Sequence, residues 1–271
     1  MKKFFTYLLA IAAVTTVISC SKDDGPEDPE PKPDVSGQDF TETVSGVKFD
    51  MVYVKGGTFS MGATEEQGTE DPHGDEYPVH SVTLSDYYIG KFEVTQGLWK
   101  AVMGDNPCEL KKGDDYPVEM VSWNDIQDFL NKLNKVTGKK YALPTEAQWE
   151  YAARGGANSK GYKYSGSNTV GDVAWYNANS DNSTHTVGKK QANELGIYDM
   201  SGNVWEWCSD WSGKYSSDSQ TNPTGPTTGS LRVLRGGSWN NNARYCRVSY
   251  RDFDYPDDSS CLLGFRLALL P

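Results

Sequence analysis

The loss of helical periodicity after Gly155-Gly156 is the feature that most restricts the fold of this chain. Beyond these glycines the residues are rich in Gly, Asn, Ser and Trp, and they contain only short strand candidates, at 204–207, 232–235 and 265–269. Two extended segments open the folded part, 51–61 with a turn at Gly56-Gly57 and 79–89, and no repeat occurs at a fixed period. These patterns predict a single domain of the α+β class with a large share of loop.

Three helices are predicted before the two glycines. The first covers residues 95–103. Ser122 and Asp125 form a capping box for the second, in which apolar residues then recur on one face. Thr145 and Gln148 repeat the capping pattern for a third helix, which ends where glycine permits a left-handed turn.

The N-terminus has the layout of a signal peptide, predicted over residues 1–19. A basic start precedes an uncharged apolar run that is too short to span a bilayer, and Val17-Ile18-Ser19-Cys20 closes it. This ending resembles a bacterial lipobox, which implies that Cys20 becomes the lipid-modified first residue of the mature chain. An ordinary secretory signal is the alternative.

Residues 20–40 are predicted to form an acidic, Pro-rich tether, because they contain too few apolar residues to fold. Lys22-Asp23-Asp24, directly behind the lipidated cysteine, looks like the surface-export signal of Bacteroidetes lipoproteins. The resemblance implies an outer-membrane lipoprotein exposed on the cell surface. The remaining residues, 41–271, are predicted to be the folded domain.

The net charge of the chain is −11, with 37 acidic residues against 26 Lys and Arg. A general nucleic-acid binder needs a basic surface against the phosphates, so nucleic acid is excluded as a partner class.

Short motifs between residues 45 and 270 match one protein family in the same order. They include Glu93-Val94-Thr95, Leu143-Pro144-Thr145-Glu146-Ala147, Gly202-Asn203-Val204-Trp205-Glu206-Trp207, Arg235-Gly236-Gly237-Ser238-Trp239 and Gly264-Phe265-Arg266. Through them the chain resembles the formylglycine-generating-enzyme, or sulfatase-modifying-factor, family. The resemblance implies a loop-rich, C-type-lectin-like α+β fold.

The enzymes of this family oxidise a substrate cysteine with Cu(I), which two active-site cysteines five positions apart hold as thiolates. Counted from Gly236-Gly237-Ser238, the second cysteine falls on Cys246 and the first falls on Asn241. An amide cannot replace a thiolate toward Cu(I), so no copper is expected, and Ser238, Asn241 and Cys246 are interpreted as a vestigial site. A copper-dependent oxidoreductase and a structural role in an envelope complex are the alternatives to a binding function.

The family also carries calcium. By position, the resemblance implies that the side chains of Asp199 and Glu206 and the carbonyls of Gly202 and Val204 hold a structural Ca²⁺ ion, since hard oxygen ligands suit this ion. The alternative is that the two carboxylates only hydrogen-bond the loop.

Four cysteines remain besides the lipidated one: Cys108, Cys208, Cys246 and Cys261. Four cysteines allow three disulfide connectivities, and a bridge between Cys208 and Cys246, which follow two of the family motifs, is favoured.

Residues 240–263 have an unusual composition, because Lys, Glu, Gln, Met and Trp are all missing from them. Mutation of the adenines in Asn codons cannot produce any of these five residue types, whereas it can produce the Tyr, Asp, Ser, Cys, Phe and Leu found here. The segment therefore resembles the variable region of proteins that diversity-generating retroelements diversify. Tyr, Ser and Asn are also typical of paratopes.

The segment is predicted to be an exposed face that binds an external protein or glycan, with a solvated loop containing some buried aromatics as the alternative. The predicted contact residues are Asn240, Asn241, Asn242, Tyr245, Tyr250, Asp252, Phe253, Asp254, Tyr255, Asp258, Ser259, Ser260 and Leu262. The sequence names no ligand and leaves the oligomeric state open.

Overall fold

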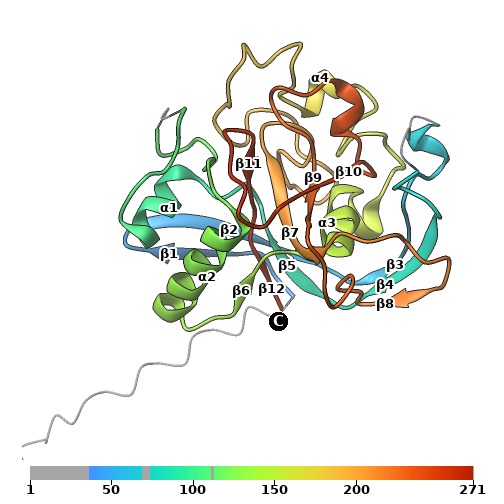
Figure 1. Cartoon of the computed structure of the whole chain (residues 1–271), viewed down its shortest axis with the longest axis horizontal. Coiled ribbons are helices and arrows are strands. Elements are labelled where there is room, and N and C mark those ends of the chain that lie inside the picture. The colour runs from blue at the N-terminus through green and yellow to red at the C-terminus, as the bar shows by residue number, and fades with distance from the viewer. Residues whose placement is uncertain (1–36, 69–73, 111–112, 271) are drawn as a thin grey trace, which may run out of the picture. The chain divides into compact units, whose positions relative to one another are not determined.

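The computed structural model describes residues 37–68, 74–110 and 113–270 (Figure 1). The predicted signal peptide, the lipidated Cys20 and the tether up to residue 36 lie outside the described residues. The first strand begins at Phe40, one residue before the predicted start of the domain, and Asp39 already accepts a hydrogen bond from the Tyr53 backbone N–H at 2.8 Å. Residues 37–40 therefore pack with the domain.

The three predicted helices are confirmed as α1 (Gln96–Met103), α2 (Trp123–Thr137) and α3 (Glu146–Ala153). Both predicted capping boxes form, and in the first the Ser122 hydroxyl accepts from the Asp125 backbone N–H at 3.1 Å. The apolar face of α2 is buried through Ile126, Phe129, Leu130 and Leu133. A short helix, α4 (Val170–Val173), and 3₁₀ turns at Glu65–Gln67, Gly156–Asn158 and Ala243–Cys246 are additions.

The strands form three sheets. The first has the order β1 (Phe40–Val44), β2 (Val47–Val54), β5 (Tyr87–Gly90), β12 (Ala268–Leu269) and β6 (Tyr141–Ala142), so it joins both ends of the domain. The second has the order β10 (Arg251–Asp254), β9 (Arg232–Arg235), β7 (Trp205–Trp211) and β11 (Leu263–Gly264). The third has the order β3 (Gly57–Met61), β4 (His80–Leu84) and β8 (Gln220–Thr221).

Three predicted extended segments are interrupted in the structure, and one of them, 79–89, is divided between β4, which ends at Leu84, and β5, which begins at Tyr87. The segment 51–61 is divided at Gly56, where a Cβ atom would lie 2.3 Å from the carbonyl oxygen of Leu84, so the chain passes too close to its neighbour for any larger residue. The candidate 265–269 keeps only its end as β12, because Arg266 leaves the ladder and binds the Gly90 carbonyl in the interior at 2.9 Å.

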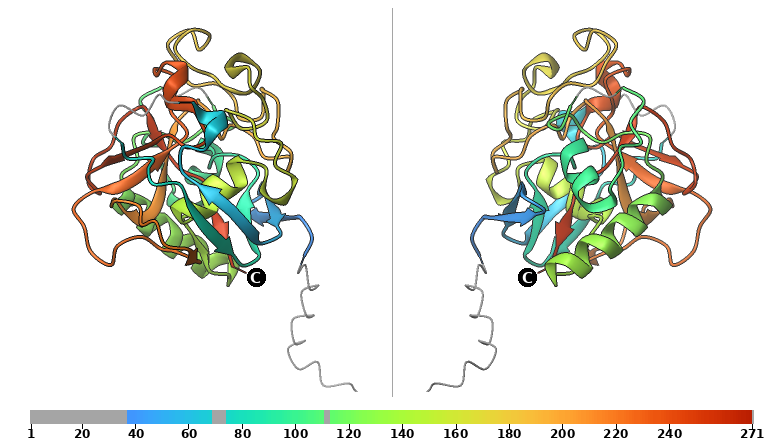
Figure 2. Two further views of the ribbon diagram at one scale, coloured as in Figure 1. Left: turned by 90° about the vertical axis from the view of Figure 1, so that its right-hand side faces the viewer. Right: turned by 90° about the vertical axis from the view of Figure 1, so that its left-hand side faces the viewer.

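The helices occupy different sides of the domain. Figure 1 shows α1 beside β1 and β2, α2 packs against α1 and β6, and α3 lies among β3, β4 and β7. The side views in Figure 2 show the irregular stretch between α3 and β7, in yellow, gathered at the end opposite α2. Two large apolar clusters form the core, one around α2 and Trp207, the other around α3 and Trp149. Among the described residues, no helix combines the length and apolar character that crossing a membrane requires.

The favoured disulfide between Cys208 and Cys246 is not formed, and the prediction is wrong for this structure. Cys208 and Cys246 each carry a free thiol. Cys208 points into the apolar cluster around α3, whereas Cys246 packs into a separate small cluster with Tyr164 and Val173. The two thiols thus occupy different parts of the interior.

Candidate functional site

The three residues of the vestigial site lie together at the turn after β9. The Ser238 hydroxyl donates to the Asn241 side-chain oxygen at 2.6 Å, and the Ser238 backbone N–H donates to the same oxygen at 3.0 Å. Gly237, in the left-handed region at φ 74°, lies against Cys246, so that an added Cβ would be 3.1 Å from the Cys246 sulfur. The turn therefore brings the predicted residues into one place.

The chemistry of these residues does not fit copper. The Asn241 side-chain oxygen is already held by Ser238. Complete burial raises the pKa of the Cys246 thiol to about 12, so the sulfur carries its proton at neutral pH. One protonated thiol and one amide do not supply the two thiolates that a linear Cu(I) site needs.

The predicted calcium residues lie around Arg266. Both carboxylate oxygens of Glu206 accept from this guanidinium at 2.6 Å, and Trp149 also donates to Glu206 at 2.7 Å. Asp199 accepts from the Gly188 backbone N–H at 2.7 Å through one oxygen. Its other oxygen, Oδ1, is buried and has no hydrogen-bond partner among the described residues.

Glu93, which the sequence did not point to, completes this cluster. Its carboxylate accepts from the Asn203 side chain at 2.6 Å and from the Val204 backbone N–H at 3.1 Å. Burial raises the pKa of Glu93 well above its usual range and that of Asp199 to about 6, and Glu206 adds to both shifts. Three buried carboxylates thus face a single arginine.

A hard divalent cation fits this excess of buried negative charge and the unpartnered oxygen of Asp199. Glu206 fits less well as a ligand, because Arg266 engages both of its oxygens. In the described part of the chain, no three His, Cys, Asp or Glu side chains are grouped as a metal site. The carbonyls of Gly202 and Val204 would therefore have to complete the coordination.

The C-terminal segment predicted to bind a ligand divides into a buried half and an exposed half. Cys246, Arg247, Val248, Ser249, Tyr250 and Arg251 are all buried. The Arg247 guanidinium pairs with Glu76 at 2.8 Å, and Ser249 donates to the same carboxylate. This half belongs to the scaffold.

Tyr250 is the predicted contact residue that the structure places in the core. Its side chain is only 6% exposed, and its ring packs on Tyr245 with centroids 4.8 Å apart and on Trp205 at 6.1 Å. The prediction of an exposed Tyr250 is therefore wrong, because the aromatic cluster beside β7 covers it. Tyr245 is half-buried, and its hydroxyl accepts from Arg244 at 2.8 Å.

The exposed half begins within β10. Phe253 is 42% exposed and Tyr255 is 56% exposed, and they alternate with the partly exposed Asp252 and Asp254 along the strand. The remaining predicted residues are exposed (Asn240, Asn242, Asp258 and Ser259) or partly exposed (Asn241, Ser260 and Leu262).

Backbone hydrogen bonds anchor this exposed half to the scaffold. The N–H of Asn124, at the start of α2, donates to the Pro256 carbonyl at 3.1 Å, and the N–H of Met120 donates to the Ser260 carbonyl at 2.9 Å. Phe253 pairs with Val233 of β9 in the antiparallel ladder. Exposed aromatic and polar side chains are thus presented on a supported backbone.

The acidic residues of this turn interact with one another. Asp254 has a pKa of about 6, raised by partial burial and then by its hydrogen bond to Asp258. Partial burial and the hydrogen bond to Asp258 thus favour the protonated form of Asp254.

The sequence patterns did not predict the buried ion pairs that hold the elements around the site together. Arg235 binds Glu146 at 2.8 Å and Glu150 at 2.6 Å, and Arg251 binds Glu146 at 2.7 Å, all with almost no exposure. The available signal was a charged residue inside an otherwise apolar or glycine-rich motif, as in Gly264-Phe265-Arg266.

Comparisons with known proteins agree with this geometry. Residues 38–270 match the model of the sulfatase-modifying factor enzyme 1-like domain. The chain is 42% identical to the formylglycine-generating enzyme of Streptomyces coelicolor, over 80% of this chain and 88% of that protein. It is 35% identical to the chaperone protein LppX of Paenibacillus barcinonensis, over 92% of each chain.

Among solved structures, the chain is similar to Treponema denticola variable protein 1. The TM-score is 0.78 and the identity 36%, over 86% of this chain and 99% of that one. The predicted loop-rich, C-type-lectin-like α+β fold in a single domain is confirmed. The chain therefore belongs to the family of sulfatase-modifying factor enzyme 1-like domains.

Proposed function

We propose that this protein is a surface-displayed lipoprotein whose domain binds an external protein or glycan without catalysis. The observation that carries the proposal is the pair of exposed aromatic side chains, Phe253 and Tyr255, on the anchored backbone of β10 and the turn after it. Exposed aromatic side chains cost free energy unless a partner covers them, and they supply most of the energy at many interfaces.

The composition around these aromatics supports the same role. Asp258 and Ser259, which follow them in the chain, and Asn240 and Asn242 are exposed residues with adaptable hydrogen-bonding groups. The similarity to a protein titled a variable protein, at 36% identity, is consistent with such a surface. The residues at the copper position favour binding over oxidation, because Asn241 and the protonated Cys246 do not form a thiolate pair.

Lipid attachment to Cys20 would place this surface outside the cell. The support for it is the lipobox-like ending of the predicted signal peptide, followed by an acidic Pro-rich segment. Metabolic labelling with a palmitate analogue should mark the wild-type chain, and Cys20→Ser should remove the label. Protease treatment of intact cells then tests whether the domain lies outside.

Ligand binding is tested with the mature chain on a glycan array and by cross-linking to surface proteins of candidate partner cells. The double variant Phe253→Ser/Tyr255→Ser should lose the captured ligand. The matched control is Val136→Ser/Leu270→Ser, since these two apolar side chains are 64% and 68% exposed elsewhere on the domain. Equal loss in both variants would contradict a site at β10.

Catalysis is tested separately. Copper-loaded protein is incubated with a cysteine-containing sulfatase peptide, and the aldehyde is sought by mass spectrometry. Its formation would overturn the non-catalytic proposal.

A structural calcium ion is part of the proposal, held through the Asp199 side chain and the Gly202 and Val204 carbonyls, with Glu206 beside them. The unpartnered Oδ1 of Asp199 supports it. Calcium should raise the melting temperature, and a chelator should reverse the rise. The Asp199→Asn variant should respond less. A melting temperature that is the same with calcium and with chelator would rule out a stabilising ion.

The presence of a retroelement is tested on the DNA around the gene. A near-copy of the last coding segment, with adenines at the variable positions and a reverse transcriptase nearby, is expected if residues 240–263 are diversified.

A further inference from the structure

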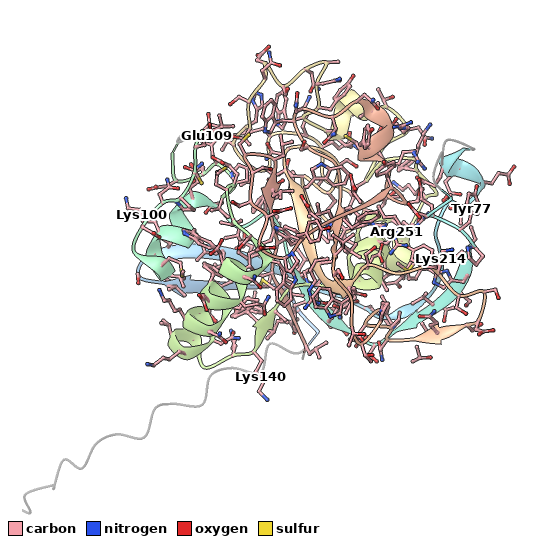
Figure 3. The ribbon with its side chains drawn as sticks, viewed as in Figure 1. Tyr77, Lys100, Glu109, Lys140, Lys214 and Arg251 are labelled. Atoms are coloured by element: carbon pink, nitrogen blue, oxygen red, sulfur yellow. The ribbon has the colours of Figure 1, made fainter. Side chains whose placement is uncertain are left out.

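A cavity of about 290 Å³ lies between α3, the β3–β4 pair and the loop 213–226. This volume is close to the lower end of the range, roughly 300 Å³ upward, in which proteins bind small molecules. His80, Asp210 and Gln220 are among its lining residues, and Arg251 forms part of the floor. Figure 3 shows Lys214 and Arg251 near one another on the side of β3 and β4. No part of the proposed function uses this cavity.

Two glycines of the loop 213–226 beside the cavity pack closely against neighbouring side chains. A Cβ atom at Gly225, which has a left-handed φ of 71°, would lie 2.9 Å from the Asp210 Cβ. A Cβ atom at Gly213 would lie 2.6 Å from the ring of Pro226. Because these glycines let the loop approach so closely, the cavity has a defined shape.

The ions beside the cavity neutralise one another. Arg251 donates to both oxygens of Glu146 at 2.8 and 2.7 Å, and its remaining nitrogen donates to the carbonyls of Asp75 and Gly213. Glu146 also accepts from Arg235 and from the Tyr215 hydroxyl. These ion pairs neutralise Arg251 and Glu146, which leaves Lys214, an exposed residue of the lining, and the carboxylate form of Asp210 as charges of opposite sign beside the cavity.

Two other polar side chains in the lining keep one free atom each. His80 is 5% exposed and Asp210 is 4% exposed. His80 uses Nδ1 on the Pro78 carbonyl at 3.0 Å, and Asp210 uses Oδ2 on the Glu146 backbone N–H and the Ser209 hydroxyl. Within the described part of the chain, neither His80 Nε2 nor Asp210 Oδ1 has a hydrogen-bond partner. Both atoms keep accessible surface in the lining of the cavity, where a ligand can reach them.

The free atoms suit a hydroxyl group better than an ion. Burial, followed by the charge of Glu146, raises the pKa of Asp210 to about 7, so both its acid and its carboxylate forms exist at neutral pH. A hydroxyl can accept from the first form and donate to the second. Met61, Trp211 and Pro226 give the cavity apolar walls against which C–H groups can pack.

From this juxtaposition of His80, Asp210 and apolar walls we infer that the cavity binds one neutral hexopyranose unit. Such a ring offers several hydroxyls at its edge and C–H groups on its faces, and it carries no charge. The exposed Phe253 and Tyr255 are not among the residues that line the cavity, so the cavity adds a second binding function to the domain.

The experiment titrates the mature chain with the methyl glycosides of glucose, galactose and mannose, followed by calorimetry and saturation-transfer NMR. At least one of them should bind saturably. His80→Phe keeps the ring contact with Tyr215, whose centroid lies 4.7 Å away, but removes Nε2, and it should weaken binding roughly tenfold. Gln220→Ala, at a half-buried residue of the lining, should weaken sugar binding less. It is the variant to measure if His80→Phe does not fold.

Two controls separate this site from the exposed face. Tyr77→Ser, at an exposed residue outside the lining, should bind the sugar like the wild type, and so should Phe253→Ser/Tyr255→Ser. Loss of sugar binding in the latter variant would place the sugar at β10 and overturn the inference. The absence of saturable binding for all three glycosides, or tighter binding of methyl glucuronide, would overturn it as well.

Discussion

Residues 246–251 and residues 252–260 are neighbours in one C-terminal segment, yet they meet opposite environments. The first six residues are buried. Two of them, Arg247 and Arg251, form ion pairs with acidic residues from distant parts of the chain. The next nine are mostly exposed and combine aromatic rings with carboxylates and hydroxyls. The unusual composition of the segment therefore does not by itself mark a contact surface, because the buried residues that support the exposed ones share it.

The largest expected effect comes from removing a charge from the buried half. Arg247→Met leaves the Glu76 carboxylate buried without its cation, which should cost about 3–5 kcal/mol of unfolding free energy. Urea denaturation of the purified domain measures it. The double variant Arg247→Met/Glu76→Gln should recover part of the loss, because it removes the uncompensated charge. A single variant as stable as the wild type would break the comparison.

Tyr250→Ala should produce the next largest loss of stability. The ring fills the space between Tyr245 and Trp205, so its removal leaves a cavity, and the expected cost is about 3 kcal/mol. Tyr250→Phe keeps the ring and should cost much less. If Tyr250→Ala unfolded at the same urea concentration as the wild type, Tyr250 would belong with the exposed half.

The exposed half should respond to pH through Asp254. Its pKa of about 6 lies above the ordinary value of 3.8, so the folded state binds this proton more tightly than the unfolded state does. The contribution of Asp254 to the free energy of unfolding is therefore present at low pH and is lost as the pH rises through about 6. Asp254→Asn should melt slightly higher than the wild type at pH 7.5, and the difference should shrink between pH 6 and 4. A difference that stayed constant with pH would show that the pKa of Asp254 is not raised in the folded state.

The smallest expected effect on stability comes from the exposed aromatics. Phe253→Ser and Tyr255→Ser should each change the unfolding free energy by only about 0.5 kcal/mol, because both side chains are exposed at the surface of the domain. The same substitutions should weaken binding of the external ligand strongly. A large stability loss would mean that these rings support the scaffold.

The local features of the fold were predictable from the sequence. The capping boxes at Ser122 and Thr145 join atoms only three residues apart, so a short motif specifies each helix start. The strand at 232–235 was also predicted with its observed bounds. The turn at Gly56-Gly57 was predictable as well, because two adjacent glycines mark it, whereas nothing local marked the break after Leu84 that divides the segment 79–89.

The candidate sites were only partly predictable for the same reason. The turn at Gly237 and Ser238 was visible as a motif, and the structure brings Asn241 and Cys246 to it. The pairing of Arg247 with Glu76 joins residues 171 positions apart, and nothing local selects that partner among the many acids. Sequence patterns likewise gave no sign that Tyr250 faces inward while Phe253 faces outward.

The amino-acid sequence by itself determined the family, the three helices and the loss of a cysteine from the copper pair, because each is written in contiguous motifs. Tertiary structure alone decided which half of the C-terminal segment is exposed, which acids pair with the buried arginines, and where the cavity beside His80 and Asp210 lies. These depend on how distant segments pack. Burial and the partner that a buried charge finds are properties of the assembled interior and not of any stretch of chain.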